Sequence, residues 1–317
     1  MALPKRLADI LRLKNERLES VPDAFTSAMV QAQKGILAEL IAALGTLDRD
    51  GQFITLSSAN LIRIEEISNL LEQLFTSQSD YVEAVTALAG EFDEQALLSD
   101  SYFQELDVDF TVPTIAEEVF LTRKANALDM FLGDGIKGNV SARIRQQIVS
   151  AVTSGASYSD TLTSLRELIE GSEGKDGLLV RYSRQITSDA FAITDRSYTD
   201  VIREERGYEW FLYSGGLMDS TRCFCKHRNG KFFHLKEIQD WGNGKGIGIC
   251  LSKGGLWDGA FDGTNSQNVF VYAGGYNCLH SIQPVSVFAV PKSDVERNIA
   301  NGNYEPSAVE LDLINAG

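Results

Sequence analysis

The 317-residue chain lacks two features that would place it in or across a membrane. It has no run of about twenty apolar residues, the length that a bilayer-spanning helix requires. Its first twenty residues, MALPKRLADILRLKNERLES, alternate charged side chains with Leu and contain no apolar stretch followed by a small-residue cleavage site. We therefore expect a protein that has no secretion signal and makes no membrane contact.

Cysteine and histidine are also scarce, with four and three copies. Four cysteines in a chain of this length do not suggest a disulfide scaffold, and the missing secretion signal favours a reducing compartment. All seven residues nevertheless fall in one segment of about sixty residues. They are Cys223, Cys225, His227, His234, Cys250, Cys278 and His280.

Positive charge is in short supply, since the net charge is −15. This excludes a protein that coats duplex nucleic acid over its whole surface, because phosphate binding requires clustered Lys and Arg. The charge is unevenly distributed. Residues 1–110 carry eight cations and nineteen acidic residues, a balance of −11, whereas residues 220–254 carry seven cations and two acidic residues, a balance of +5.

The first two thirds of the chain show the periodicity of amphipathic helices. Apolar residues at 61, 64, 67, 71 and 74 lie on one helical face, with Ser57 or Ser58 as the N-cap. Asp50-Gly51 predicts a turn between helices, and Gly155 predicts the end of another helix. A long helix is expected from about 178 to 205. We interpret 1–110 as an acidic helical domain and 111–206 as a helical middle segment.

The pattern changes at Tyr208, where a small module of short strands is expected over 207–290. Its predicted elements are a strand ending at a Gly pair, a hairpin over 220–234, a short helix in LKEIQDW, a flexible loop over 242–263, and strands in NVFVY and SIQPVSVFAV. An acidic tail, 291–317, either docks elsewhere or is partly disordered. The fold class is α+β, with mainly α-helical N-terminal two thirds and a small C-terminal α+β module of short strands.

The clustered Cys and His residues predict one kind of metal site. A structural zinc ion needs four soft or borderline ligands, and Cys225, His234, Cys278 and His280 could supply them. The Cys-x-Cys and Cys-x-His spacings are shorter than usual, but alternate side chains share a face in an extended strand. The alternatives are that the cysteines are buried core residues and the histidines cap loops, or that Cys278 with His234 forms a nucleophilic pair.

The stretch YEWFLYSGGLMDSTRCFCKHRNGKFFHLKEIQDW, followed later by GGYNCLHSIQPVSV, resembles the C-terminal module of phage minor head (minor capsid) proteins of the Mu F-like and SPP1 gp7-like family. The resemblance covers about 178–290, and Cys223, Cys250 and the loop 242–263 are extra to it. The matching positions are Asp219, Thr221, Arg222, Cys225, Arg228, Gly230, Lys231, Trp241, Gly274, Gly275, Cys278, His280 and Pro284.

The resemblance implies a structural component of a tailed-phage virion, not an enzyme. Such a protein would associate with the portal protein or the major capsid protein in the head interior or at the portal vertex. It would pass through the host cytoplasm during head assembly and could take part in DNA packaging or delivery. The basic segment 220–254 could contact encapsidated DNA. Arg222 is expected either to be held by Asp219 or to be solvated.

Two other classes of function stay open from the residues. One is a Cys/His-dependent hydrolase or toxin-like enzyme, since modules of this family can be fused to toxin domains. The other is a zinc-dependent nucleic-acid-binding module, whose DNA binding would depend on salt and on metal content.

Overall fold

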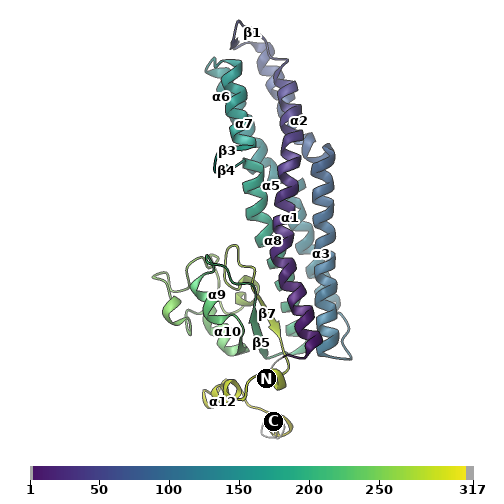
Figure 1. The fold of residues 1–317 in the computed structure, drawn as a ribbon, viewed down its shortest axis with the longest axis vertical. Coiled ribbons are helices and arrows are strands. Elements are labelled where there is room, and N and C mark those ends of the chain that lie inside the picture. The colour runs from purple at the N-terminus through teal and green to yellow at the C-terminus, as the bar shows by residue number, and fades with distance from the viewer. Residues whose placement is uncertain (1–2, 312–317) are drawn as a thin grey trace. The chain divides into compact units, whose positions relative to one another are not determined.

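The computed structural model describes residues 3–311 and divides the chain into two compact units. One unit comprises Met1–Ser20, Phe92–Arg123 and Ser188–Gly317, and the other comprises Val21–Glu91 and Lys124–Thr187. The long helices α1 (Lys5–Leu44), α3 (Ser79–Leu106), α4 (Thr114–Leu132) and α8 (Leu178–Arg206) contribute to both units (Figure 1). Each unit is therefore assembled from separate stretches of the chain. The four segments expected from the sequence, 1–110, 111–206, 207–290 and 291–317, are instead continuous.

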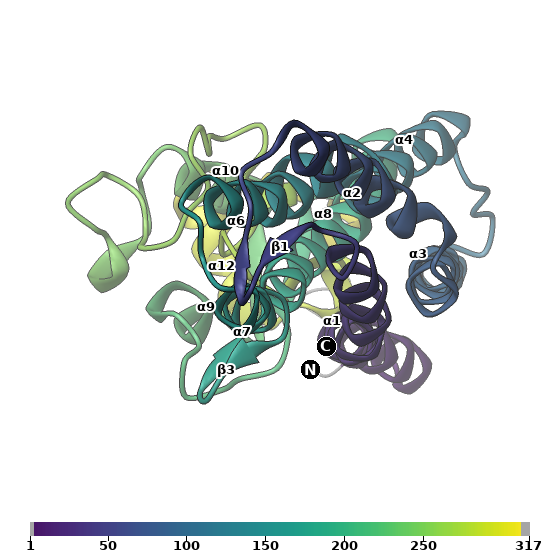
Figure 2. The same cartoon turned by 90° about the horizontal axis from the view of Figure 1, so that it is seen from above.

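The second unit, Val21–Glu91 with Lys124–Thr187, is helical. Besides parts of the long helices it contains α2 (Ser58–Ser77), α5 (Asp134–Ile136), a π-helical turn (Lys137–Ser141), α6 (Ala142–Thr153) and α7 (Tyr158–Ile169). Figure 2 shows α2, α6 and α7 bundled with α1. Ser57 is the N-cap of α2, as expected, and its side chain accepts a hydrogen bond from the Asn60 amide. Two short hairpins, β1 (Arg49–Asp50) with β2 (Phe53–Ile54) and β3 (Gly171–Ser172) with β4 (Lys175–Asp176), connect helices.

The first unit contains the small module, which is built on an antiparallel sheet with the strand order β6-β5-β7. The central strand β5 (Trp210–Ser214) is fully buried and pairs with β6 (Lys231–His234) and β7 (Ser281–Pro284). Short helices surround it: α9 (Cys223–Arg228), α10 (Leu235–Gly242), α11 (Val269–Tyr272) and α12 (Lys292–Ala300), with 3-10 turns at Gly248–Cys250 and Val287–Ala289. The α+β fold class is confirmed, with helices dominating the first two thirds.

Four expected elements of the module are wrong in detail. The stretch 220–234 is not a hairpin, because Cys223–Arg228 forms a helix and only Lys231–His234 is a strand. NVFVY contains the helix α11. The last expected strand ends at Pro284, because a 3-10 turn with Ser286 as its N-cap follows within two residues. The loop 242–263 contains buried residues, among them Trp257, whose ring stacks on Phe224 with centroids 3.8 Å apart.

The C-terminal segment docks on the module as far as it is described. Helix α12 is followed by Tyr304, whose ring packs against Trp210 with centroids 5.3 Å apart. The end of the expected tail, 312–317, lies outside the described residues. Within 3–311, none of the helices combines the length and apolar character needed to cross a membrane.

Candidate metal centre

A buried Cys/His cluster forms where three parts of the module meet. Helix α9 supplies Cys225, the turn before β7 supplies Cys278 and His280, and the central strand β5 supplies Tyr213. All four side chains are at most 5 % exposed. The sequence pattern had predicted three of these residues as metal ligands, and the fold brings their ligand atoms within 4.8 Å of one another. We call this group the Cys225 cluster.

The spacing of the Cys225 cluster suits a tetrahedral metal ion. The two sulfurs, Cys225 Sγ and Cys278 Sγ, are 3.8 Å apart. Two sulfurs that each lie about 2.3 Å from a tetrahedral zinc ion are separated by about 3.8 Å. His280 Nδ1 lies 4.0 Å from Cys278 Sγ. The residues therefore form a three-ligand group that could hold a metal ion without rearrangement of the backbone.

Glycine at position 274 allows the two sulfurs to lie this close to the backbone. A Cβ atom on Gly274 would stand 2.4 Å from Cys225 Sγ and 2.6 Å from Cys278 Sγ. Both distances are far below van der Waals contact, so any side chain would displace the cysteines. Gly215 similarly packs against His280, because a Cβ there would lie 2.8 Å from the imidazole ring.

The electrostatics of the cluster favour one ionised sulfur. The hydrogen bond from Cys225, together with His280 and Arg196, holds the pKa of Cys278 well below that of an ordinary thiol. The same hydrogen bond raises the pKa of Cys225, and burial adds to the effect. Burial also raises the pKa of Tyr213 well above 10, so its hydroxyl stays protonated and donates to Cys225 Sγ at 3.2 Å. A thiolate is the form of cysteine that binds metals.

Arg196 from α8 anchors the segment that carries two of the ligands. Its Nη1 donates to the backbone carbonyls of Cys278 and His280, each at 3.1 Å. The guanidinium is buried, so its positive charge acts on Cys278 with little screening. This arginine had not been singled out in the sequence, where it is one of several cations along an amphipathic helix.

A cavity of about 300 Å³ lies beside the cluster. Cys225, Cys278 and His280 line it, and so does Arg222, which immediately precedes α9. The remaining lining residues are Glu19, Gly216, Met218, Ser220, Thr221, Asn277 and Leu279. The cluster is therefore buried within the module but borders a space that a small molecule could enter.

His234 does not belong to the cluster, contrary to the four-ligand set expected from the sequence. It is the N-cap of α10, where its Nδ1 accepts a hydrogen bond from the Lys236 amide at 3.3 Å. It pairs with Trp210 at one end of β5, whereas Ser281, which follows His280, pairs with Ser214 at the other end. Burial lowers the pKa of His234 to about 4, and the charge of Lys236 adds to this. The residue is a neutral capping histidine.

The other two cysteines form a disulfide bond, which the sequence did not suggest. Cys223 and Cys250 are bonded, and His227 Nδ1 lies 3.6 and 3.5 Å from their sulfurs. Cys223 and Cys225 stand two positions apart on a helix, so their side chains point in different directions. One therefore forms the disulfide near the surface while the other enters the core.

The remaining motif positions have structural roles in the same module. The guanidinium of Arg228 lies over the rings of Phe224 and Trp241, at 3.8 and 4.5 Å, and donates to the carbonyls of Phe224 and Gly246. Gly230 has a φ of 74° in the turn before β6, where Lys231 begins the strand. Tyr102 donates to the carbonyl of Pro284 at 2.7 Å.

The structure does not bear out the hypothesis that Asp219 holds Arg222. The backbone carbonyl of Asp219 accepts a hydrogen bond from Lys226 at 3.0 Å, and Thr221 Oγ1 accepts one from the Met218 amide. Arg222 instead borders the cavity, and no ion pair between it and Asp219 is found among the described residues. Burial raises the pKa of Asp189, and the positive charge of Arg222 is one of several groups that oppose this rise.

A buried ion pair in the same unit was missed by sequence reasoning. Lys14 Nζ lies 3.2 Å from Asp195 Oδ1, and neither side chain is exposed. Asp195 Oδ1 also accepts hydrogen bonds from Gln95 and Ser99. A signal was present, because Lys14 occupies a position in the apolar stripe formed by Leu7, Leu11 and Leu18.

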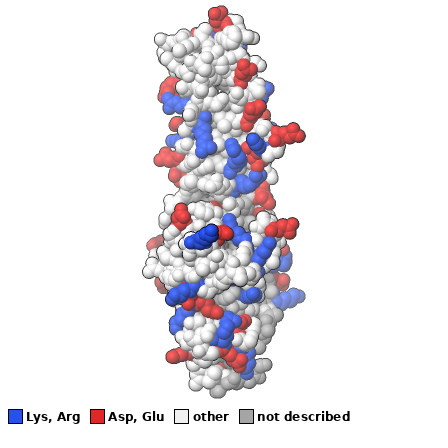
Figure 3. All heavy atoms as spheres, turned by 90° about the vertical axis from the view of Figure 1, so that its left-hand side faces the viewer, with Lys and Arg blue, Asp and Glu red and all other residues white. Residues whose placement is uncertain are grey.

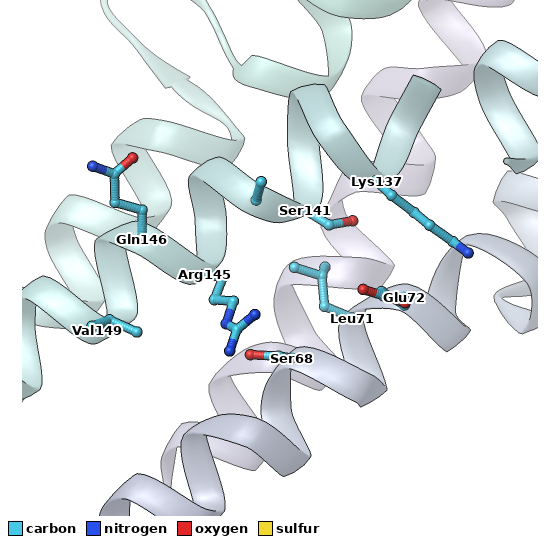
Figure 4. A pocket seen from close by; sticks show the side chains of 9 residues that line it. Ser68, Leu71, Glu72, Lys137, Ser141, Arg145, Gln146 and Val149 are labelled. Atoms are coloured by element: carbon cyan, nitrogen blue, oxygen red, sulfur yellow. The ribbon is translucent and has the colours of Figure 1, made fainter. Parts of the chain in front are cut away.

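A second hollow, in the helical unit, holds no such cluster among its described lining residues. It has a volume of about 280 Å³ and lies between α2, the π-helical turn and α6. Figure 4 shows Glu72, Ser68 and Leu71 on one side and Lys137, Ser141 and Arg145 on the other. Arg145 is already paired with Glu65 at 2.7 Å. The residues that line this hollow suit helix packing more than catalysis.

Comparisons of the chain with protein-family models, with curated proteins and with solved structures find no match.

Proposed function

We propose that the protein is a structural minor capsid protein of a tailed phage. It would associate with the portal or the inner head surface during head assembly and would act without turning over a substrate. One observation carries the proposal: five of the positions that resemble the minor-head module lie together in one folded core, namely Cys225, Arg228, Trp241, Gly274 and Cys278. Arg228, Trp241, Gly274 and Cys278 serve packing there, as a scaffold requires.

The partners we propose are the portal protein, the major capsid protein, or both. The first 110 residues carry a balance of −11, and helical faces rich in acids suit protein contacts with basic surfaces. On the face shown in Figure 3, Lys and Arg side chains lie among Asp and Glu side chains. Such a mixed surface favours contacts with another protein over wrapping by nucleic acid.

Contact with encapsidated DNA through 220–254 is a weaker part of the proposal. Of the seven cations in this segment, Arg228 is buried against aromatic rings and Arg222 borders the cavity. Lys226, Lys231, Lys236, Lys245 and Lys253 are exposed. These five lysines could meet phosphates, so DNA contact would be local and strongly dependent on salt.

We also propose that the Cys225 cluster holds a structural zinc ion, with Cys225, Cys278 and His280 as its ligands. Two thiolates and one imidazole match the ligand preference of zinc, and the sulfur separation fits its bond lengths. Zinc would join α9 to the start of β7 and so stabilise a module whose sheet has only three short strands. Elemental analysis of the purified protein tests this, and a zinc content well below one per chain would contradict it.

The alternative with a supporting observation is a Cys/His-dependent hydrolase. Cys278 has a lowered pKa and borders a cavity, as a nucleophile would. However, its sulfur is 3.8 Å from a second cysteine and the imidazole is 4.0 Å away, which suits shared metal binding better than proton transfer.

Co-expression with the portal and major capsid proteins of the same phage tests the main proposal. Heads and portal complexes are separated from free protein on a density gradient. We expect the chain to sediment with one of them, and the association to survive Cys278→Ser less well than Lys226→Ser, a matched change of an exposed residue. A chain that stays at the top of the gradient with both partners present would overturn the proposal.

A further inference from the structure

The cavity beside the Cys225 cluster borders all three ligand residues, whereas Tyr213 is not among the residues that line it. The Tyr213 hydroxyl contacts both sulfurs, at 3.2 and 3.9 Å. The phenol therefore lies on the protein side of the sulfurs, and the cavity lies on another side. An ion held by the cluster would face this space.

The cluster supplies only three ligands among the described residues. A tetrahedral zinc ion has four positions, and sites with three protein ligands leave the fourth for water or an exogenous group. His280 also has a buried Nε2 without a hydrogen-bond partner among the described residues, and its ring borders the cavity. A buried polar atom without a partner is costly, which points to a polar ligand next to it.

The charges around the cavity favour a ligand with a single negative charge. A bound divalent ion would displace the proton from the second thiol as well. Two thiolates then neutralise the ion, so the net charge of the site depends on the surrounding groups. Arg222 and the buried Arg196 act on the cluster as cations. Glu19 lines the cavity and Asp189 accepts a hydrogen bond from the nearby Asn277 amide at 2.5 Å. These two acids would oppose a more highly charged anion such as a phosphate dianion.

We propose that the cavity binds a small carboxylate, which completes the coordination of the metal ion and pairs with Arg222. The inference rests on the zinc site proposed above. Arg222 suits this role because a planar guanidinium matches the geometry of a carboxylate. The carboxylate could come from a free metabolite or from an acidic side chain of a partner protein, and a cavity of about 300 Å³ admits either.

The test uses the full chain loaded with Co²⁺ in place of zinc, in a buffer without carboxylates or halides, and acetate as the probe. Thiolate ligation gives a near-ultraviolet sulfur-to-cobalt charge-transfer band, and the visible bands of tetrahedral Co²⁺ respond to the fourth ligand. We expect acetate to change the visible bands in a saturable way. His227→Ala, which removes the imidazole beside the Cys223–Cys250 disulfide, should leave the spectrum unchanged.

Two variants locate the binding site within the cavity. Arg222→Ala should weaken acetate binding about tenfold or more, since a charge-assisted hydrogen bond is lost. Lys226→Ala removes a neighbouring cation that does not line the cavity and should leave the affinity unchanged. An acidic peptide replaces acetate in a second arm, and tighter binding than acetate would identify a partner side chain as the source.

The outcomes separate this inference from the proposals on which it rests. If the charge-transfer band forms but acetate leaves the visible bands unchanged, the carboxylate site is wrong while the metal site stands. If Arg222→Ala and Lys226→Ala weaken binding equally, pairing with Arg222 is wrong. If the charge-transfer band does not form at all, the metal site is wrong and the carboxylate site falls with it. Sedimentation of the unmodified chain with heads or portal complexes is measured separately, so a failure of that proposal is distinguishable from all three results.

Discussion

The buried Lys14–Asp195 pair should be one of the most sensitive points of the fold. Lys14 is completely buried, its Nζ is 3.2 Å from Asp195 Oδ1, and Gln283 Oε1 is 3.4 Å away. Lys14→Met removes the cation and leaves a buried carboxylate whose remaining donors among residues 3–311 are Gln95 and Ser99. Breaking a buried pair from one side costs about 3 to 5 kcal/mol, and we expect the free energy of unfolding to fall by that amount.

Replacing both partners should cost much less. In Lys14→Met/Asp195→Leu neither charge of the pair remains, and such exchanges are often neutral or stabilising by about 1 to 4 kcal/mol. The double variant should therefore be more stable than Lys14→Met alone, and the mutant cycle should show a coupling energy well above 1 kcal/mol. Exposed Arg12, which pairs with Glu16 on the same helix, provides the control: Arg12→Met should change stability by less than about 1 kcal/mol.

Urea denaturation, monitored by tryptophan fluorescence, measures the change in the free energy of unfolding of the compact unit that contains the Lys14–Asp195 pair. All three tryptophans, Trp210, Trp241 and Trp257, lie in the unit that contains the pair. A loss below about 1 kcal/mol for Lys14→Met with an unchanged urea dependence would refute the reasoning.

The pH dependence of stability gives a second measurement on the same pair. Burial lowers the pKa of Lys14 below its ordinary 10.5. Between the folded and the unfolded pKa, the unfolded chain binds more protons, so stability rises with pH in that window and is flat below it. Lys14→Met should abolish this rise, whereas Arg12→Met should keep it.

Three further changes test the module. Gly274→Ala would place a Cβ 2.4 Å from Cys225 Sγ and should cost about 1 to 3 kcal/mol by overpacking and lower the zinc content, whereas an alanine that leaves both unchanged would contradict the geometry. His234 has a folded pKa of about 4, below the unfolded 6.5, so stability should fall as pH drops from 6.5 towards 4, and urea titrations of His234→Gln should lack this fall. Reducing the Cys223–Cys250 bond should cost about 2 to 4 kcal/mol in the same assay, while a chain with both cysteines changed to Ser should not respond to reductant.

The helical part of the fold could be predicted from the sequence because its signals are local. The apolar residues of α2 recur every three or four positions, and Ser57 and Ser157 cap α2 and α7 as N-cap preferences suggest. The strands of the module could be predicted only in part. NVFVY has strand-forming residues, yet Val269 and Phe270 are buried in a short helix, so tertiary packing overrides local preference there.

The sequence predicted which residue types form the candidate site, but it did not predict correctly which of these residues lie together. Cys225, Cys278 and His280 were expected to lie together and do, whereas His234 stands at the far end of β5. The separation follows from register: His234 pairs with Trp210, while Ser214 pairs with Ser281, next to His280. Register depends on contacts that are distant along the chain, and a single sequence does not reveal them.

The different positions of Cys223 and Cys225 follow from one local fact, the helical turn of Cys223–Arg228. In a strand the two side chains would share a face, and both would compete for the same partner. In a helix they diverge, so Cys223 bonds to Cys250 while Cys225 meets Cys278. The disulfide thus holds α9 to the loop on one side, and the Cys225 cluster holds it to the start of β7 on the other. A short helix fixed on both sides keeps Arg222, just before its first residue, at the edge of the cavity.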